Sequence, residues 1–70
     1  MTARRFPPPW SVDERGAAFA VCDANGQALA YVYFEEEPGR QSAAKLLTKD
    51  EARRIATNIA ELPELLNKTQ

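Results

Sequence analysis

The sequence has no histidine and a single cysteine, and each shortage removes a class of function. Without histidine, the chain lacks the side chain that most often serves as a general base in catalysis. The one thiol, Cys22, cannot form an intramolecular disulfide and has no second cysteine or histidine with which to build a zinc site. We therefore expect a protein that is not an enzyme and that holds no metal or cofactor.

Net charge and long apolar runs are also scarce. The formal net charge is −1, which argues against a dominant electrostatic attraction to nucleic acid or to anionic lipid. No apolar run approaches the roughly 20 residues of a membrane-spanning helix. The first ten residues contain arginines but no apolar stretch typical of a secretory signal. These absences predict a cytoplasmic protein with no membrane contact.

The 70 residues suffice for one small domain. A chain of this size buries only about 60% of its unfolded surface, so its core is marginal without a disulfide, a metal or a second copy. The first two are excluded by composition, which leaves good packing or self-association. We expect an extended proline-rich segment over residues 1–9, a single domain over residues 10–66 and a tail over residues 67–70.

The stretch FPPPW places three prolines between Phe6 and Trp10. Each proline fixes its own φ angle and pushes the preceding residue out of the α region, so the segment should run extended as polyproline II. Two roles are open at this point. The segment either covers the domain's own core or docks in the aromatic groove of a partner.

A β-hairpin over residues 17–35 is the strongest local signal, with a short strand predicted just before it at WSVDE. The runs AAFAVC and ALAYVYFE flank DANGQ, in which Asn25 and Gly26 are typical of a hairpin turn. Because both runs are apolar and rich in strand-forming residues, this hairpin should form the centre of a small antiparallel sheet.

Two hairpin registers fit the sequence. A two-residue turn pairs Phe19 with Val32, whereas a three-residue loop over residues 24–26 pairs Phe19 with Tyr31. We favour the three-residue loop because Asp23 suits the first position of a type I turn.

A polar loop with Pro-Gly turn chemistry follows, and residues 43–47 could form a third strand. A helix should then begin at Thr48, because Glu51 three residues later completes a capping box. Pro63 ends or kinks this helix, and one further turn should fold Leu65 and Leu66 onto the core. An apolar stripe follows helical spacing along it: Ala52, Ile55, Ala56, Ile59 and Leu62. The prediction is an α+β domain with three to four antiparallel strands and one C-terminal helix on one face.

Both faces of the predicted hairpin are apolar, which is unusual for a sheet with one solvated side. One strand alternates Phe19 and Val21 with the small residues Ala18, Ala20 and Cys22. A single helix covers only one face, so the proline segment, a second copy of the chain or a different partner must cover the other.

Rigid aromatic side chains give large contact areas at low entropic cost. The residues that we expect to bind a partner are Trp10, Tyr31, Tyr33 and Phe34. The predicted function is a non-enzymatic protein-interaction module that can form a homodimer.

An alternative function is nucleic-acid binding by an accessory protein. It rests on a local basic cluster that consists of Arg40, Lys45, Lys49, Arg53 and Arg54. The simpler interpretation is a solvated helix face on which Asp50 pairs with Arg53 and Arg54.

The strings RRFPPPW, DANGQALAYVYFE, EPGR, SAAKLLTKDEARRIA and LPELL together resemble a family of short uncharacterised alphaproteobacterial proteins, of the rhizobial group especially. The resemblance spans residues 4–66. It implies a bacterial, cytosolic, stand-alone domain and carries no activity, because the function of that family is unknown.

Overall fold

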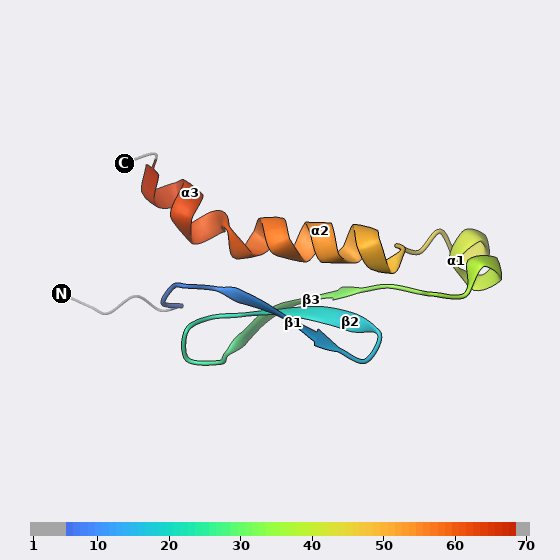
Figure 1. The fold of residues 1–70 in the computed structure, drawn as a ribbon, viewed down its shortest axis with the longest axis horizontal. Helices are drawn as coiled ribbons and strands as arrows, with labels where there is room; N and C mark the ends of the chain where they lie inside the picture. Colours follow the sequence, from blue (N-terminus) through green and yellow to red (C-terminus); the bar gives the residue numbers. More distant parts are fainter. Residues whose placement is uncertain (1–5, 69–70) are drawn as a thin grey trace.

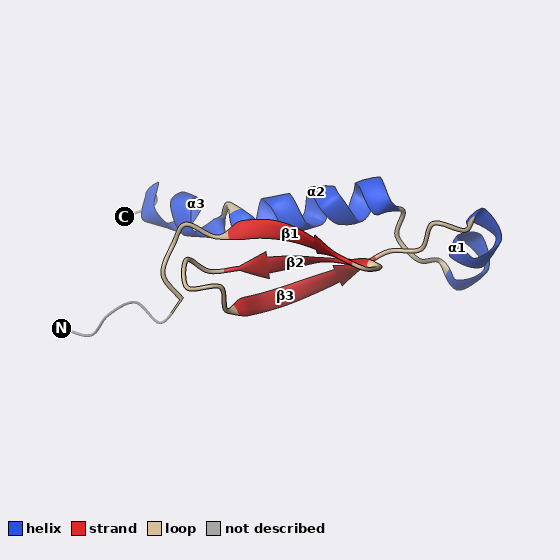
Figure 2. Ribbon diagram, turned by 60° about the horizontal axis from the view of Figure 1, so that its bottom comes forward, coloured by secondary structure: helices blue, strands red, loops and turns tan. Residues whose placement is uncertain are grey.

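The computed structural model describes residues 6–68, which form three strands followed by three helices (Figure 1). Their bounds are β1 Ser11–Arg15, β2 Ala18–Cys22, β3 Ala28–Tyr33, α1 Pro38–Ala44, α2 Lys49–Ala60 and α3 Leu62–Lys68. The strands form one antiparallel sheet in the order β1-β2-β3. Helix α2 runs along one face of the sheet and contacts all three strands (Figure 2). The α+β class is confirmed, with three strands in the described part of the chain and no fourth.

The β2–β3 loop is the predicted three-residue loop, but the strand register differs from the predicted one. Asp23 opens a type I turn, since the Gly26 N–H donates to its carbonyl at 3.0 Å and Gly26 takes a left-handed φ of 87°. Its carboxylate accepts the N–H groups of Asn25 and Gln27, each at 2.9 Å. This network explains why a buried carboxylate is tolerated in the loop.

The pairing beyond this loop corrects the predicted register. Phe19 pairs with Val32 and not with Tyr31, because an irregularity between Val21 and Cys22 shifts the register by one residue. A β-bulge adds a residue to one strand, and here it reverses the faces that the loop length alone would set. The turn residues therefore predict the length of the loop. They do not predict the strand register, which depends on the bulge.

Residues 43–47 do not form the predicted strand. Pro38 occupies the first turn of helix α1, a position where its fixed φ and missing N–H are tolerated. The helix ends at Ala44, its C-cap residue Lys45 adopts a left-handed φ of 56°, and Leu46 is then exposed. The two ends of the segment that contains α1 are joined by a hydrogen bond, in which the Glu35 N–H donates to the Leu47 carbonyl at 3.0 Å. Helix α1 contacts no other helix or strand within residues 6–68.

Helix α2 begins as predicted. The Thr48 hydroxyl accepts the Glu51 N–H at 3.0 Å, and the Glu51 carboxylate accepts the Thr48 N–H at 2.9 Å. This capping box satisfies two backbone donors that a helix start otherwise leaves unpaired.

The core lies between α2 and the sheet. The Phe19 and Phe34 rings pack with centroids 5.3 Å apart. Ala52 and Ala56 are fully buried and let the helix approach the strands closely. Two members of the predicted stripe, Ile55 and Leu62, are each 41% exposed, because the line of contact follows Ala52, Ala56, Ile59 and Ala60.

Two further predictions at the chain ends need correction. Helix α3 extends to Lys68, so residues 67 and 68 are not part of a tail. Leu65 is 50% exposed and does not fold onto the core. The side chain of Leu66 lies outside the described residues. Within the described part of the chain, no helix is long and apolar enough to cross a membrane.

The proline segment belongs to the domain and is not a continuous polyproline II helix. The Ala24 N–H donates to the Pro7 carbonyl at 2.9 Å, which ties the segment to the β2–β3 loop. The Trp10 indole N–H donates to the Phe6 carbonyl at 3.0 Å, so the segment folds back on itself. The peptide bond between Pro8 and Pro9 is cis. Trp10 packs against the core on the helix side of the sheet.

Candidate functional site

The sheet face opposite α2 is the candidate site, and it is named the open face here. Pairing across the strands sets its rows: Asp13, Ala20 and Tyr31 in one, and Arg15, Ala18 and Tyr33 in the next. Figure 2 shows helix α2 along the other side of the sheet. The open face therefore has small residues along its central strand and long side chains along both edges.

The open-face side chains of the central strand are buried, although none of the helices within residues 6–68 covers that face. Ala20 has no exposed surface, and Ala18 and Cys22 are 3% and 5% exposed. Arg15 explains part of this burial, because its guanidinium reaches from the Ala18 row to the Cys22 Sγ atom at 3.5 Å. Small side chains on a central strand can thus be covered by the long side chains of their neighbours.

Arg15 is held over the face by its own strand. Its Nε atom donates to the Asp13 Oδ2 atom at 2.8 Å, and both residues project from β1 on the same side. The hydrogen bond to Asp13 raises the pKa of the Arg15 guanidinium above its ordinary value. The open face accordingly presents a fixed positive charge beside a negative one.

Two tyrosines dominate the other edge. Tyr31 and Tyr33 are 49% and 67% exposed, and their rings stack with centroids 6.3 Å apart. They project from β3 on the same side because side chains alternate with a period of two along a strand. A stacked pair of exposed tyrosines offers a rigid apolar surface with hydroxyl groups at its rim.

The four predicted contact residues separate. Tyr31 and Tyr33 lie together on the open face, whereas Trp10 packs on the helix side of the sheet. Phe34 is only 7% exposed and belongs to the core, which corrects its assignment as a contact residue. The physical reason is the register, which turns Val32 and Phe34 toward α2.

The five residues of the predicted basic cluster also separate. Arg40 and Lys45 lie on α1 or at its end, and the other three lie on α2. Carboxylates engage four of the cations, since Arg40 pairs with Glu35 and Glu37, Lys49 with Glu14, and both helix arginines with Asp50. The predicted pairs of Asp50 with Arg53 and Arg54 are confirmed, and no continuous basic surface forms from these residues.

Sequence reasoning missed Asp13 and Arg15 as members of the site. The signal for Asp13 was available, because alternation in WSVDE places Ser11 and Asp13 opposite Trp10 and Val12. Comparisons of the chain with protein-family models, with curated proteins and with solved structures found no match.

Proposed function

We propose that this chain is a non-enzymatic protein-interaction module that forms a homodimer through the open face of its sheet. The observation that carries the proposal is the stacked, exposed pair Tyr31 and Tyr33 beside a central strand of small residues. Tyrosine is enriched in protein interfaces, since it buries a large apolar area while its hydroxyl still finds a hydrogen-bond partner.

The charges of the open face favour a second copy over a different protein. A two-fold contact brings the same patch from both copies together, so the patch must be complementary to itself. Asp13 and Arg15 lie side by side with opposite charge. In a two-fold arrangement, Arg15 of one copy can lie against Asp13 of the other, which a patch of one sign would forbid.

The shape of the chain supports the same proposal. Its radius of gyration is 14.3 Å, whereas a compact domain of this length is expected near 11 Å. One helix layer on one sheet layer leaves a large surface relative to the core. Closing two open faces on each other would bury the tyrosines and double the number of layers that exclude water.

The experiment is the solution mass over a concentration series, measured by sedimentation, for the wild type and two matched variants. We expect the wild type to reach twice the chain mass of 7.8 kDa. Tyr33→Glu should stay monomeric, because it replaces an exposed ring of the open face with a carboxylate that would lose its water in the interface. Ile55→Glu adds the same charge at an exposed apolar site on α2 and should still dimerise.

A wild type that stays monomeric at every concentration would overturn the proposal. So would a dimer that Tyr33→Glu leaves intact.

We place the module in the cytoplasm, where the lone buried thiol of Cys22 remains reduced.

A further inference from the structure

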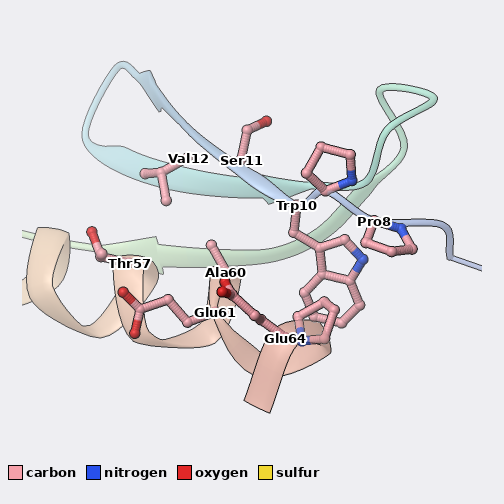
Figure 3. A pocket seen from close by; sticks show the side chains of 10 residues that line it. Pro8, Trp10, Ser11, Val12, Thr57, Ala60, Glu61 and Glu64 are labelled. Carbon is pink, nitrogen blue, oxygen red and sulfur yellow. The ribbon is translucent and has the colours of Figure 1, made fainter. Parts of the chain in front are cut away.

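We propose a second, separate binding site, a groove that takes a partner segment with a lysine or arginine beside an apolar side chain. The groove lies on the helix side, where β1 begins and α2 passes into α3, and has a volume of about 570 Å³. Figure 3 shows Val12 on its strand wall and Thr57 and Ala60 on its helix wall. Its size is within the range of known ligand sites.

The apolar wall of the groove is rigid before any partner binds. Trp10 and the prolines Pro8 and Pro9 line one side, and Ala60 and Pro63 line the other. The tryptophan is fixed by the hydrogen bond from its indole N–H to the Phe6 carbonyl. A wall of prolines and one anchored tryptophan loses little conformational entropy when a ligand binds, and preorganisation of this kind favours affinity.

The charge of the groove selects the partner. Among residues 6–65, Glu61 and Glu64 are the charged residues in its lining, and none of the basic residues of that range lines it. Seven of the ten acidic residues accept a hydrogen bond or form an ion pair within residues 6–68, which leaves Glu36 and these two. Two of the three carboxylates that are not engaged thus border the same apolar groove.

A cation fits both features of the groove. The ammonium or guanidinium group can pair with the carboxylates of Glu61 and Glu64, while its aliphatic stem lies against apolar surface. The indole of Trp10, which is half-buried, can attract a cation to its ring face through its quadrupole. Phosphate groups and acidic segments would be repelled, so the site is distinct in kind from a nucleic-acid contact.

Trp10 is the chain's only tryptophan, so its fluorescence reports directly on the groove. The probe is a blocked tetrapeptide that alternates leucine and lysine, titrated into the full chain at a fixed protein concentration. The control probe alternates leucine and glutamate. We expect a saturable change with the lysine peptide at concentrations up to about 1 mM, weakened by added salt, and none with the glutamate peptide.

Three variants locate the site. Glu61→Gln with Glu64→Gln should weaken binding of the lysine peptide about tenfold or more. Glu36→Gln removes a carboxylate that is equally unengaged but lies outside the groove, and it should bind like the wild type. Tyr33→Glu should also bind, because the open face lies on the other side of the sheet.

Equal responses to both peptides would overturn the inference, as would unchanged binding by the double variant or no saturation at all. A fluorescence change that follows protein concentration in the absence of peptide would assign the groove to a second copy, which also overturns it. Circular dichroism checks that each variant keeps its helix and strand content. Because Tyr33→Glu tests the dimer separately, failure of one site leaves the other standing.

Discussion

The two faces of one three-stranded sheet are buried in different ways. On the helix face, Phe19 and Val21 of the central strand are covered by a second layer, helix α2. On the open face, Ala18 and Ala20 are equally buried, yet what covers them is the side chains of the edge strands. Large core residues therefore need a separate element, and small ones do not.

This difference changes what an apolar pattern on both faces means. An alternation of large and small apolar residues looks in sequence like two faces that each need a cover. Here the small residues of β2 lie beneath the long side chains of Arg15 and Tyr31, so the central strand is not exposed on the open face. What it exposes are the tyrosines at its edge, and those are the residues that a partner would meet.

The largest expected effect is a difference in unfolding free energy between removing a buried core ring, Phe34, and removing an exposed ring, Tyr33. Phe34→Ala should destabilise the chain by about 3–5 kcal/mol, because it removes a buried ring from its contact with Phe19. Tyr33→Ala, measured in dilute monomer, should change the unfolding free energy by at most about 1 kcal/mol. Urea denaturation followed by circular dichroism measures both.

Equal losses at Phe34 and Tyr33 would break the comparison between the faces. The loss at Phe34 rivals the whole stability of a small domain. If Phe34→Ala is already unfolded without urea, this outcome also agrees with the prediction. Phe34→Leu, a smaller change, then supplies a measurable value.

Parts of this fold follow from local sequence rules. The start of α2 was predictable, because Thr48 and Glu51 satisfy backbone groups within one turn of helix. The three-residue loop was predictable for the same reason, since Asp23 bonds to its own neighbours. Interactions between residues two to four positions apart leave a recognisable pattern in the sequence.

Other parts depend on contacts that no local rule encodes. The bulge that pairs Phe19 with Val32 decides which aromatic residues reach the core, and it moved Phe34 from the expected site to the interior. Helix α1 was predicted as a turn and a strand because Pro38 and Gly39 are also typical of turns. The groove joins residues about 50 positions apart, such as Trp10 and Ala60, which periodicity cannot bring together.

The second effect compares one substitution on the two faces. Ala52→Val should destabilise the chain by about 1–3 kcal/mol, because the added methyl groups meet the sheet in a closed layer. Ala20→Val should lose less than about 1 kcal/mol, since the side chains above it can move into solvent and valine favours strands. Thermal or urea unfolding of the two variants gives the difference directly.

A correction for helix propensity keeps that comparison fair. Valine is a weaker helix former than alanine, so Ala52→Val carries a small loss unrelated to packing. The difference between Asn58→Ala and Asn58→Val, at an exposed position of the same helix, measures that loss. If Ala20→Val proves as damaging as Ala52→Val after this correction, the cover of the open face is as rigid as a helix.

The smallest effect concerns the ion pair that joins the sheet to α2. The Lys49 Nζ atom lies 3.0 Å from the Glu14 Oε2 atom and 5.8 Å from the centroid of the Phe34 ring. Lys49→Met keeps the apolar stem and removes the charge, so it should lose less than about 1 kcal/mol in dilute buffer. In about 1 M salt, where the screening length is near 3 Å, wild type and variant should converge. A difference that persists in high salt would mean that the lysine stabilises the helix face through contacts that screening does not reach, such as its charge over the Phe34 ring. The helix face would then differ from the open face in electrostatics as well as in packing.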